Sequence, residues 1–350
     1  MLNLLLILFT ILTPQEIERR TAIDFNKQLS DLLPYIQKYY PNVDSTQIAK
    51  WEESKALEYT IIDGKKWYFR RADENLFRID PEAKALKTSL EGKERAGRDE
   101  VTKQHIKQVL SETGNKTTNN LYAKHNWEFD FKLYLTPQSG LKDGELIKVW
   151  LPMPQTNQRR QTDCAITRFN RNVEINTGAH SVAYMEGNYD AHDTTMFNIV
   201  YNFTTYAEYN PLPKCFKHKK ADANNPELKQ YLTERAPHCL FTDKVKALAD
   251  SIVGKEKRPY YQARKLFVAI RELYPWAGAC EYSIIENIPE YVIENRHGDC
   301  GQVTLLYIAM CRYKGIPARW QSGFMLHPGW DNLHDWCEIY IEGMGWIPVD

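Results

Sequence analysis

The sequence predicts a multidomain α+β protein, and three observations lead to this fold class. Helical spacing and one hairpin signal occupy residues 15–115, and short alternating apolar runs fill residues 119–236. A helical stretch followed by two strand-like runs makes up residues 237–350. Helices segregated from antiparallel strands are typical of α+β folds. We therefore predict an N-terminal helical/α+β region, an antiparallel β-sandwich and a C-terminal α+β domain.

Composition narrows the class of protein. A chain of 350 residues is long enough for two or three domains, each with its own core. The sequence holds 21 Tyr and 9 Trp, which is typical of a globular protein rather than a disordered one. Lys and Arg together number 45, as do Asp and Glu. A nucleic-acid binder normally has a basic surplus, so we exclude nucleic acid as a partner.

The first residues form a short apolar run. Leu2 to Leu12 are apolar apart from Asn3 and Thr10, and Pro14 ends the run. This length suits the apolar part of a signal peptide and falls short of the ~20 residues that a spanning helix needs. We predict a signal segment at residues 1–14 and an exported protein, whether periplasmic, cell-surface or secreted. A buried first helix is the alternative, because no Lys or Arg precedes the run and no small-residue cleavage site follows it.

The N-terminal region shows helical patterns around one hairpin signal. Apolar spacing predicts a helix within residues 15–40 and a second from Ser45 to about Leu57. Asp63-Gly64 between β-rich runs predicts a hairpin turn. Residues 81–111 carry charges at helical spacing, and residues 111–120 form a polar linker. No catalytic pattern is visible here, so we expect packing, restriction of access to a site, or contact with a partner.

The middle region reads as strands. The segments "WEFDFKLYL", "ELIKVWLPMP" and "MFNIVYNFTTYAEY" alternate or end at prolines, with polar turns between them. Such short spacing predicts an antiparallel sandwich. The basic cluster Lys217 to Lys220 is expected to be a solvated loop.

Helical patterns return from Thr242. "DKVKALADSIVG" ends on a glycine, and "PYYQARKLFVAIRELYPW" follows with apolar residues at helical spacing. Residues 303–311 are apolar around the whole turn, which predicts a buried central helix. Two strand-like runs around residues 343–345 complete the α+β pattern.

Cys300 stands at the predicted start of that buried helix. Gly298 and Gly301 leave little side-chain bulk around its thiol. The first N–H groups of a helix are unpaired and lie at the positive end of its dipole, so this position favours a thiolate. The same N–H groups can stabilise an oxyanion formed at a bound carbonyl. Cys300 is therefore a candidate nucleophile.

A thiolate nucleophile needs an imidazole, and the imidazole needs an acceptor that orients it. His334 opens the strand-like run "HDWCEIYI", and Asp350 closes the run "GWIPVD". Strands joined by a short turn lie side by side, which allows a carboxylate on one to reach a histidine on the other. Asp335 is an alternative orienting residue, but it should point to the opposite face of the strand from His334. We therefore favour Asp350.

The motifs "GDCGQVTLLYIAMCRYKGIPARW" and "LHDWCEIYIEGMGWIPVD", in the order Cys, His, Asp, resemble the transglutaminase-like superfamily. The resemblance covers roughly Thr242 to Asp350 and implies a papain-type core, and the β region before it resembles the sandwich of bacterial-type members. It implies that Cys300 is the nucleophile, that His334 is the general base and acid, and that Asp350 is the orienting residue. It also offers Trp276 as an oxyanion stabiliser.

Family members usually continue beyond the position of Asp350. If the chain ends there, we expect Asp350 to be weakly held; otherwise the sequence is a fragment of a longer chain.

The resemblance implies acyl transfer at a carboxamide of a protein or peptide through a Cys thioester, with no metal ion or organic cofactor. Water as the acceptor gives a cysteine peptidase or amidase, which we favour. A lysine amine as the acceptor gives a cross-linking protein-glutamine gamma-glutamyltransferase. A third interpretation is a catalytically idle cell-surface binding module, whose N-terminal and sandwich regions contact a protein or a glycan.

The other cysteines and histidines carry weaker signals. The seven cysteines show no CxxC spacing, so no zinc ribbon is predicted, although an even number could pair and leave one thiol over. Cys311 and Cys337 are expected to pack in the core. The remaining candidates are expected in loops, turns or cleft edges, with no metal site: Cys215, His218, His238, Cys239, His297, Asp299, His327 and Trp330.

Overall fold

The computed structural model describes residues 12–92, 96–113, 120–155, 158–177, 181–211, 219–327 and 330–350. Most of the predicted signal segment, the middle of the predicted linker, and Cys215 with His218 lie outside these ranges. Within them, no helix combines the length and the apolar character needed to span a membrane. The chain divides into two compact units, one of residues 1–96 with 213–350 and one of residues 97–212. The fold is mixed α+β with small antiparallel sheets, as predicted.

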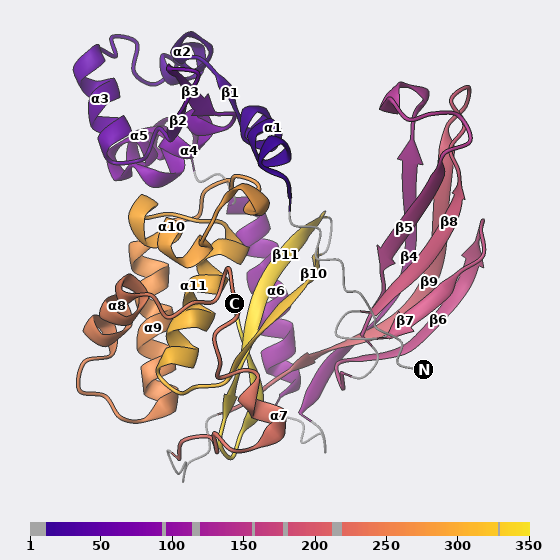
Figure 1. Cartoon of the computed structure of the whole chain (residues 1–350). Helices are drawn as coiled ribbons and strands as arrows, with labels where there is room; N and C mark the ends of the chain where they lie inside the picture. Colours follow the sequence, from indigo (N-terminus) through magenta and orange to yellow (C-terminus); the bar gives the residue numbers. More distant parts are fainter. Residues whose placement is uncertain are drawn as a thin grey trace, which may run out of the picture. The chain divides into compact units, whose positions relative to one another are not determined.

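The N-terminal part of the first unit is a small α+β assembly (Figure 1). Its strands form one antiparallel sheet in the order β1-β3-β2. The elements are α1 (Pro14–Asp24), β1 (Phe25–Lys27), α2 (Leu29–Ile36), α3 (Ser45–Glu53), β2 (Tyr59–Ile62), β3 (Lys65–Phe69), α4 (Ala72–Ile79) and α5 (Pro81–Glu91).

The helical pattern over residues 15–40 breaks into two helices, contrary to the expectation of one. Strand β1 separates α1 from α2, and its Phe25 pairs with Phe69 of β3. Phe25 is buried, and the Asp24 main-chain carbonyl accepts a hydrogen bond from the Arg70 amide. This pairing with a strand some forty residues later outweighs the local helical spacing, because tertiary contacts override propensity.

The predicted hairpin is confirmed. Ile62 pairs with Lys65 across a two-residue turn. Asp63 and Gly64 both have positive φ, 50° and 73°, as a type I′ turn requires.

The C-terminal part of the first unit is built around α11 (Cys300–Tyr313). This helix contacts α8, α9 and α10 as well as strands β10 and β11, so it is enclosed by helices and sheet (Figure 1). The sheet has the order β10-β11-β12. The elements are α7 (Pro226–Lys229), α8 (Asp243–Val253), α9 (Pro259–Leu273), the 3₁₀ turn η2 (Tyr282–Ile284), α10 (Ile288–Asn295), β10 (Ala318–His327), β11 (Trp330–Ile341) and β12 (Gly345–Val349).

One hydrophobic core runs through both parts of the first unit. It includes Trp51 and Leu76 from the N-terminal part, together with Leu306 and Ile339 from the C-terminal part. Each of these side chains is at most 2% exposed. The N-terminal region therefore packs together with the domain that carries Cys300, although most of the second unit separates them in the sequence.

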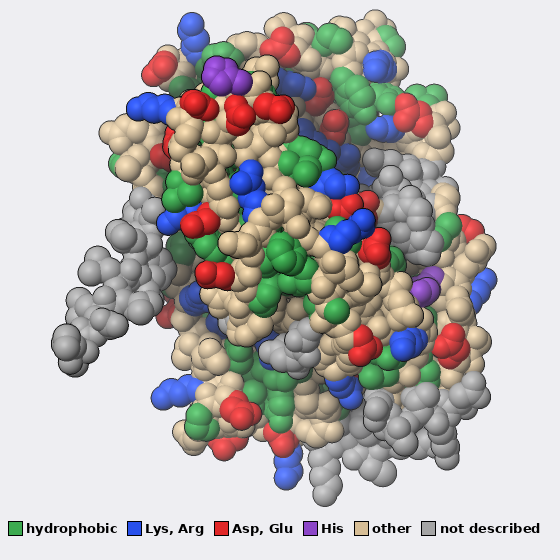
Figure 2. All heavy atoms as spheres, turned by 90° about the vertical axis from the view of Figure 1, so that its right-hand side faces the viewer, with side chains coloured by type: hydrophobic (Ala, Val, Ile, Leu, Met, Phe, Trp, Pro, Cys, Tyr) green, Lys and Arg blue, Asp and Glu red, His purple; other side chains and the backbone are tan. Residues whose placement is uncertain are grey.

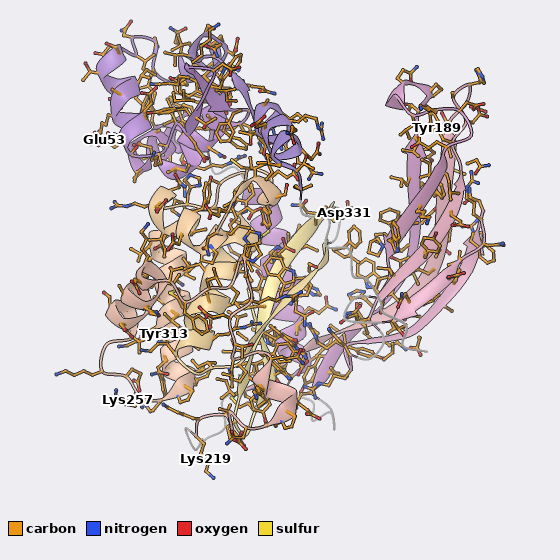
Figure 3. All side chains as sticks on the ribbon, in the orientation of Figure 1. Glu53, Tyr189, Lys219, Lys257, Tyr313 and Asp331 are labelled. Atoms are coloured by element: carbon orange, nitrogen blue, oxygen red, sulfur yellow. The ribbon has the colours of Figure 1, made fainter. Side chains whose placement is uncertain are left out.

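The second unit contains two three-stranded antiparallel sheets, in the orders β4-β9-β6 and β5-β8-β7. Alternate residues of facing strands are buried, among them Val149, Met185 and Phe197, and this pattern forms the core of a sandwich. Tyr189, labelled in Figure 3, donates a hydrogen bond to the Thr136 carbonyl. The elements are α6 (Ala96–Glu112), β4 (Leu121–Leu135), the 3₁₀ turn η1 (Pro137–Ser139), β5 (Leu146–Pro152), β6 (Gln161–Phe169), β7 (Glu174–Thr177), β8 (Ser181–Asn188) and β9 (Thr195–Glu208).

Charged side chains of both signs are interspersed on the face shown in Figure 2. This mixture agrees with equal numbers of basic and acidic residues in the sequence. Lys219 (labelled in Figure 3) and Lys220 are exposed, as the expectation of a solvated loop requires.

Candidate active site

Cys300 is the first residue of α11, and the sequence before it caps the helix. The Asp299 carboxylate accepts a hydrogen bond from the Gln302 amide at 2.9 Å, and the Gln302 side chain accepts one from the Asp299 amide at 3.2 Å. This reciprocal pair is a capping box, which fixes where the helix begins. The thiol therefore lies at the positive end of the α11 dipole, beside N–H groups that no helical carbonyl satisfies.

His334 lies in β11 and connects the thiol to Asp350. Its Nε2 is 2.9 Å from both carboxylate oxygens of Asp350, and the Cys300 side chain lies close enough to raise the pKa of the imidazole. Because Nε2 is taken by Asp350, Nδ1 is the nitrogen left for the thiol. The structure thus brings together the three residues that the sequence analysis selected as nucleophile, base and orienting residue.

Strand register explains why Asp350 reaches His334. Cys337 of β11 pairs with Val349 of β12, so one further step places Asp350 opposite Trp336. Trp336 and His334 are two residues apart and share a face of the strand, and their rings stack with centroids 5.9 Å apart. Asp350 therefore lies diagonally across from His334 on that face.

The charge on His334 is favoured by both of its partners. The hydrogen bond with Asp350, followed by the effect of the nearby Cys300 side chain, raises the pKa of His334 to about 10. The His334 side chain is 15% exposed, whereas that of Asp350 is 64% exposed. Because solvent screens an exposed carboxylate, the pair contributes less to stability than a fully buried pair of the same geometry would.

Two further carboxylates lie near Cys300. Burial raises the pKa of Asp299, and burial together with the Asp299 charge raises the pKa of Asp335 to about 6. Asp335 lies beside Gly301, since a Cβ built on that glycine would be 2.7 Å from its Oδ2. Negative charge on these two carboxylates would oppose the effect of the helix dipole at the start of α11.

Tyr282 and Trp320 are site residues that the sequence analysis missed. The Tyr282 hydroxyl donates a 2.5 Å hydrogen bond to Asp299 Oδ1. A Cβ on Gly301 would clash with that hydroxyl and approach the Trp320 ring to 3.0 Å. Gly301 indicated that space was needed beside Cys300, but no local pattern indicated which side chains fill it.

Gly301 gives a direct test of this packing. We expect Gly301→Ala to lower the free energy of unfolding by about 1–3 kcal/mol, because the added methyl overlaps Tyr282 and Asp335. Urea unfolding measures the change. Gly97→Ala in α6 is the matched control, since a Cβ there meets nothing within 4 Å. Equal midpoints for the Gly301 variant and the parent protein would contradict this account.

His297 is buried and Asp299 is partly buried, whereas the sequence analysis expected both to be exposed in a loop. His297 is 1% exposed, and burial lowers its pKa to about 4. Neither ring nitrogen has a hydrogen-bond partner among the described residues. The ring meets that of Tyr291 edge to face at 6.1 Å. His297 is therefore a neutral residue of the core behind the Cys300 helix.

Trp276 lies beside the loop that leads to Cys300. Its main chain forms an isolated parallel bridge with Gly298, and its side chain is 41% exposed. The Arg78 guanidinium is 5.0 Å from the centre of the Trp276 ring. The oxyanion role suggested for Trp276 stays a prediction.

The other cysteines are free thiols in the described residues: Cys164, Cys239, Cys280, Cys311 and Cys337. Cys311 and Cys337 are at most 1% exposed, which agrees with the expectation of core packing. Across the described ranges, no group of three or more His, Cys, Asp or Glu side chains is arranged to hold a metal ion.

Comparison with known proteins agrees with this geometry. Residues 246–350 match the model of the transglutaminase-like superfamily, so this part of the chain is a transglutaminase-like core. An uncharacterized protein of Haemophilus influenzae is 28% identical over 149 residues, which are 35% of this chain and 40% of that protein. The chain therefore spans less than half the length of this curated relative.

Solved structures that match part of this chain include a putative cysteine protease from Cytophaga hutchinsonii, with a TM-score of 0.49 and 18% identity. The match covers 67% of this chain and 77% of that chain. The periplasmic domain of TgpA from Pseudomonas aeruginosa matches with a TM-score of 0.35 and 13% identity, over 85% of this chain and 83% of that one.

Proposed function

We propose that the protein is an exported cysteine hydrolase that cleaves a carboxamide bond in a protein or peptide. The observation that carries the proposal is the hydrogen bond between His334 and the carboxylate of Asp350, with Cys300 at the start of α11 near enough to affect the imidazole. A thiol at a helix start, paired with an oriented imidazole, is the arrangement that nucleophilic acyl transfer needs.

The proposed reaction has two halves. The Cys300 thiolate attacks the carbonyl carbon, and the resulting oxyanion is stabilised by the Cys300 N–H, which the Asp299 cap does not use. The carbon–nitrogen bond then breaks as His334 gives its proton to the departing amine, which leaves an acyl thioester on Cys300. In the second half His334 takes a proton from water, the hydroxyl adds to the thioester carbonyl, and the carboxylic acid leaves as the thiol is restored.

Thiol reactivity tests the proposal before any substrate is known. We expect iodoacetamide to modify Cys300 rapidly below pH 7, where an ordinary thiol with a pKa of ~8.5 is mostly protonated. The reaction should persist toward alkaline pH, because the pKa of His334 is raised to about 10 and its imidazolium remains beside the sulfur. Mass spectrometry of peptides, from pH 4 to 9, locates the modified residue.

Cys164 provides a control within the same chain. It is another partly exposed free thiol, and burial raises its pKa, so its modification should increase only at alkaline pH. His334→Ala should slow modification of Cys300 below pH 7 and leave Cys164 unchanged. Equal behaviour of the two thiols in the parent protein would instead favour an idle cysteine in a binding module.

A further inference from the structure

Residues 275–285 connect α9 to α10 and carry Tyr282, yet their only regular structure is the short turn η2. Side chains of the N-terminal region hold this segment, hereafter the 275–285 segment, at successive positions. At Gly278, the Asn75 amide donates to the carbonyl at 2.9 Å and accepts from the N–H at 2.8 Å. Asn75 is 2% exposed and lies 203 residues away in the sequence, so it satisfies both main-chain groups of a buried residue.

Side chains of the N-terminal region also hold Glu281. The Asp24 carboxylate accepts a 2.5 Å hydrogen bond from the Glu281 amide, and it is itself fixed by Arg70 at 2.9 Å. Arg20 of α1 pairs with the Glu281 carboxylate and donates to the Ser283 hydroxyl at 3.2 Å. These contacts lie immediately before and after Tyr282.

Cys280 adds a third contact between the two parts. Its sulfur is 3.8 Å from each oxygen of Glu58, and the same carboxylate accepts a 2.8 Å hydrogen bond from the Tyr291 hydroxyl of α10. The Arg78 guanidinium over Trp276 holds the start of the segment. The N-terminal region therefore contacts the segment on both sides of Tyr282.

Tyr282 connects the 275–285 segment to Asp299, the residue that precedes Cys300. Its hydroxyl donates to Asp299, whose carboxylate also caps α11 through the Gln302 amide. Burial and the neighbouring Asp299 charge raise the pKa of Tyr282, so the hydroxyl stays protonated and remains a donor. Cys300 follows Asp299 directly in the chain.

We propose that the N-terminal region, residues 14–91, is a positioning element for the candidate active site. It holds the 275–285 segment so that Tyr282 fixes the cap of α11 and thereby the position of the Cys300 thiol against His334. Tyr282 and Asn75 are positioning residues in this scheme. The inference rests on the proposed function, because it concerns the reactivity of the same thiol.

The test measures the rate of Cys300 modification by iodoacetamide at pH 6.5 in Asn75→Ala, Tyr282→Phe and the double variant. A side-chain shift of about 1 Å can cost up to about a hundredfold in rate, so we expect a loss of about tenfold in each single variant. If Asn75 acts through Tyr282, the double variant should be no more than about twofold slower than either single variant, since coupled residues are not additive.

Asn198→Ala is the matched control, because Asn198 is also a bridging amide but lies in the second unit, where it bonds to Asp130 and Phe131. Asn198→Ala should leave the rate of Cys300 modification unchanged. None of the variants should change the rate of Cys164 modification. A parent-like rate in Asn75→Ala, or a double variant slowed by the product of the single effects, would overturn the positioning role. Failure of the proposed function is distinguishable, because it would appear in the parent protein as equal reactivity of Cys300 and Cys164.

Discussion

Replacing Cys300 with alanine should lower amide turnover by about a thousandfold or more, because the proposed reaction forms its covalent bond at this sulfur. The free energy of unfolding should change little, since Cys300 is only partly buried. Turnover is measured as release of free amine from a mixture of peptides. Incorporation of a fluorescent primary amine into the same peptides distinguishes transfer to an amine from hydrolysis.

Cys164→Ala serves as the control for loss of a partly exposed free thiol elsewhere in the chain. It should retain the turnover of the parent protein. Turnover that survives in Cys300→Ala at more than a few per cent of the parent rate would place the reaction at another residue.

Glu58→Gln should stabilise the protein at neutral and alkaline pH. Burial raises the pKa of Glu58 to about 7, against the hydrogen bonds from Tyr291 and Cys280 and the charge of Lys55, while Asp24 adds to the increase. In the unfolded chain the carboxyl ionises at its ordinary pKa of 4.5, so the folded protein loses stability as pH rises from about 4.5 to about 7. Glutamine has no such titration.

The free energy of unfolding of Glu58→Gln should therefore exceed that of the parent by about 2–3 kcal/mol at pH 8, and the difference should shrink toward pH 4. Urea unfolding across this range measures it. Glu53→Gln, at an exposed position of α3 (Figure 3), is the control and should show no such trend. A constant difference between Glu58→Gln and the parent from pH 4 to 8 would contradict the buried-carboxyl account.

The sequence allowed prediction of those features that depend on local patterns. The mostly apolar residues from Val303 to Cys311 predicted the buried helix α11, because a helix enclosed on all sides needs no polar face. Gly315, with a φ of 78°, ends that helix region as expected of a glycine there. The short turn between β11 and β12 allowed His334 and Asp350 to be placed on neighbouring strands, although their register came from the structure.

Features that depend on contacts between distant residues have no local pattern in the sequence from which they could be predicted. The Asn75–Gly278 pair joins residues 203 positions apart, and an asparagine in a helix has no local feature that indicates its partner. Tyr282 was missed for the same reason, since it acts on Asp299 from a segment with little regular structure. His297 and Asp299 were expected to be exposed because polar residues usually are, whereas core packing buries His297 and the capping box holds Asp299 in a partly buried position.

In the proposed reaction Cys300 carries a covalent acyl intermediate, and trapping this intermediate would test the proposed hydrolase activity. The protein is mixed with an acylglycine 4-nitrophenyl ester, quenched in acid within seconds and analysed by intact mass and by peptide mapping. We expect one acyl group on Cys300. Neutral hydroxylamine, which cleaves thioesters, should release it, and Cys300→Ala should carry no acyl group. An unmodified Cys300 peptide, in protein whose Cys300 reacts rapidly with iodoacetamide, would contradict the proposed hydrolase activity.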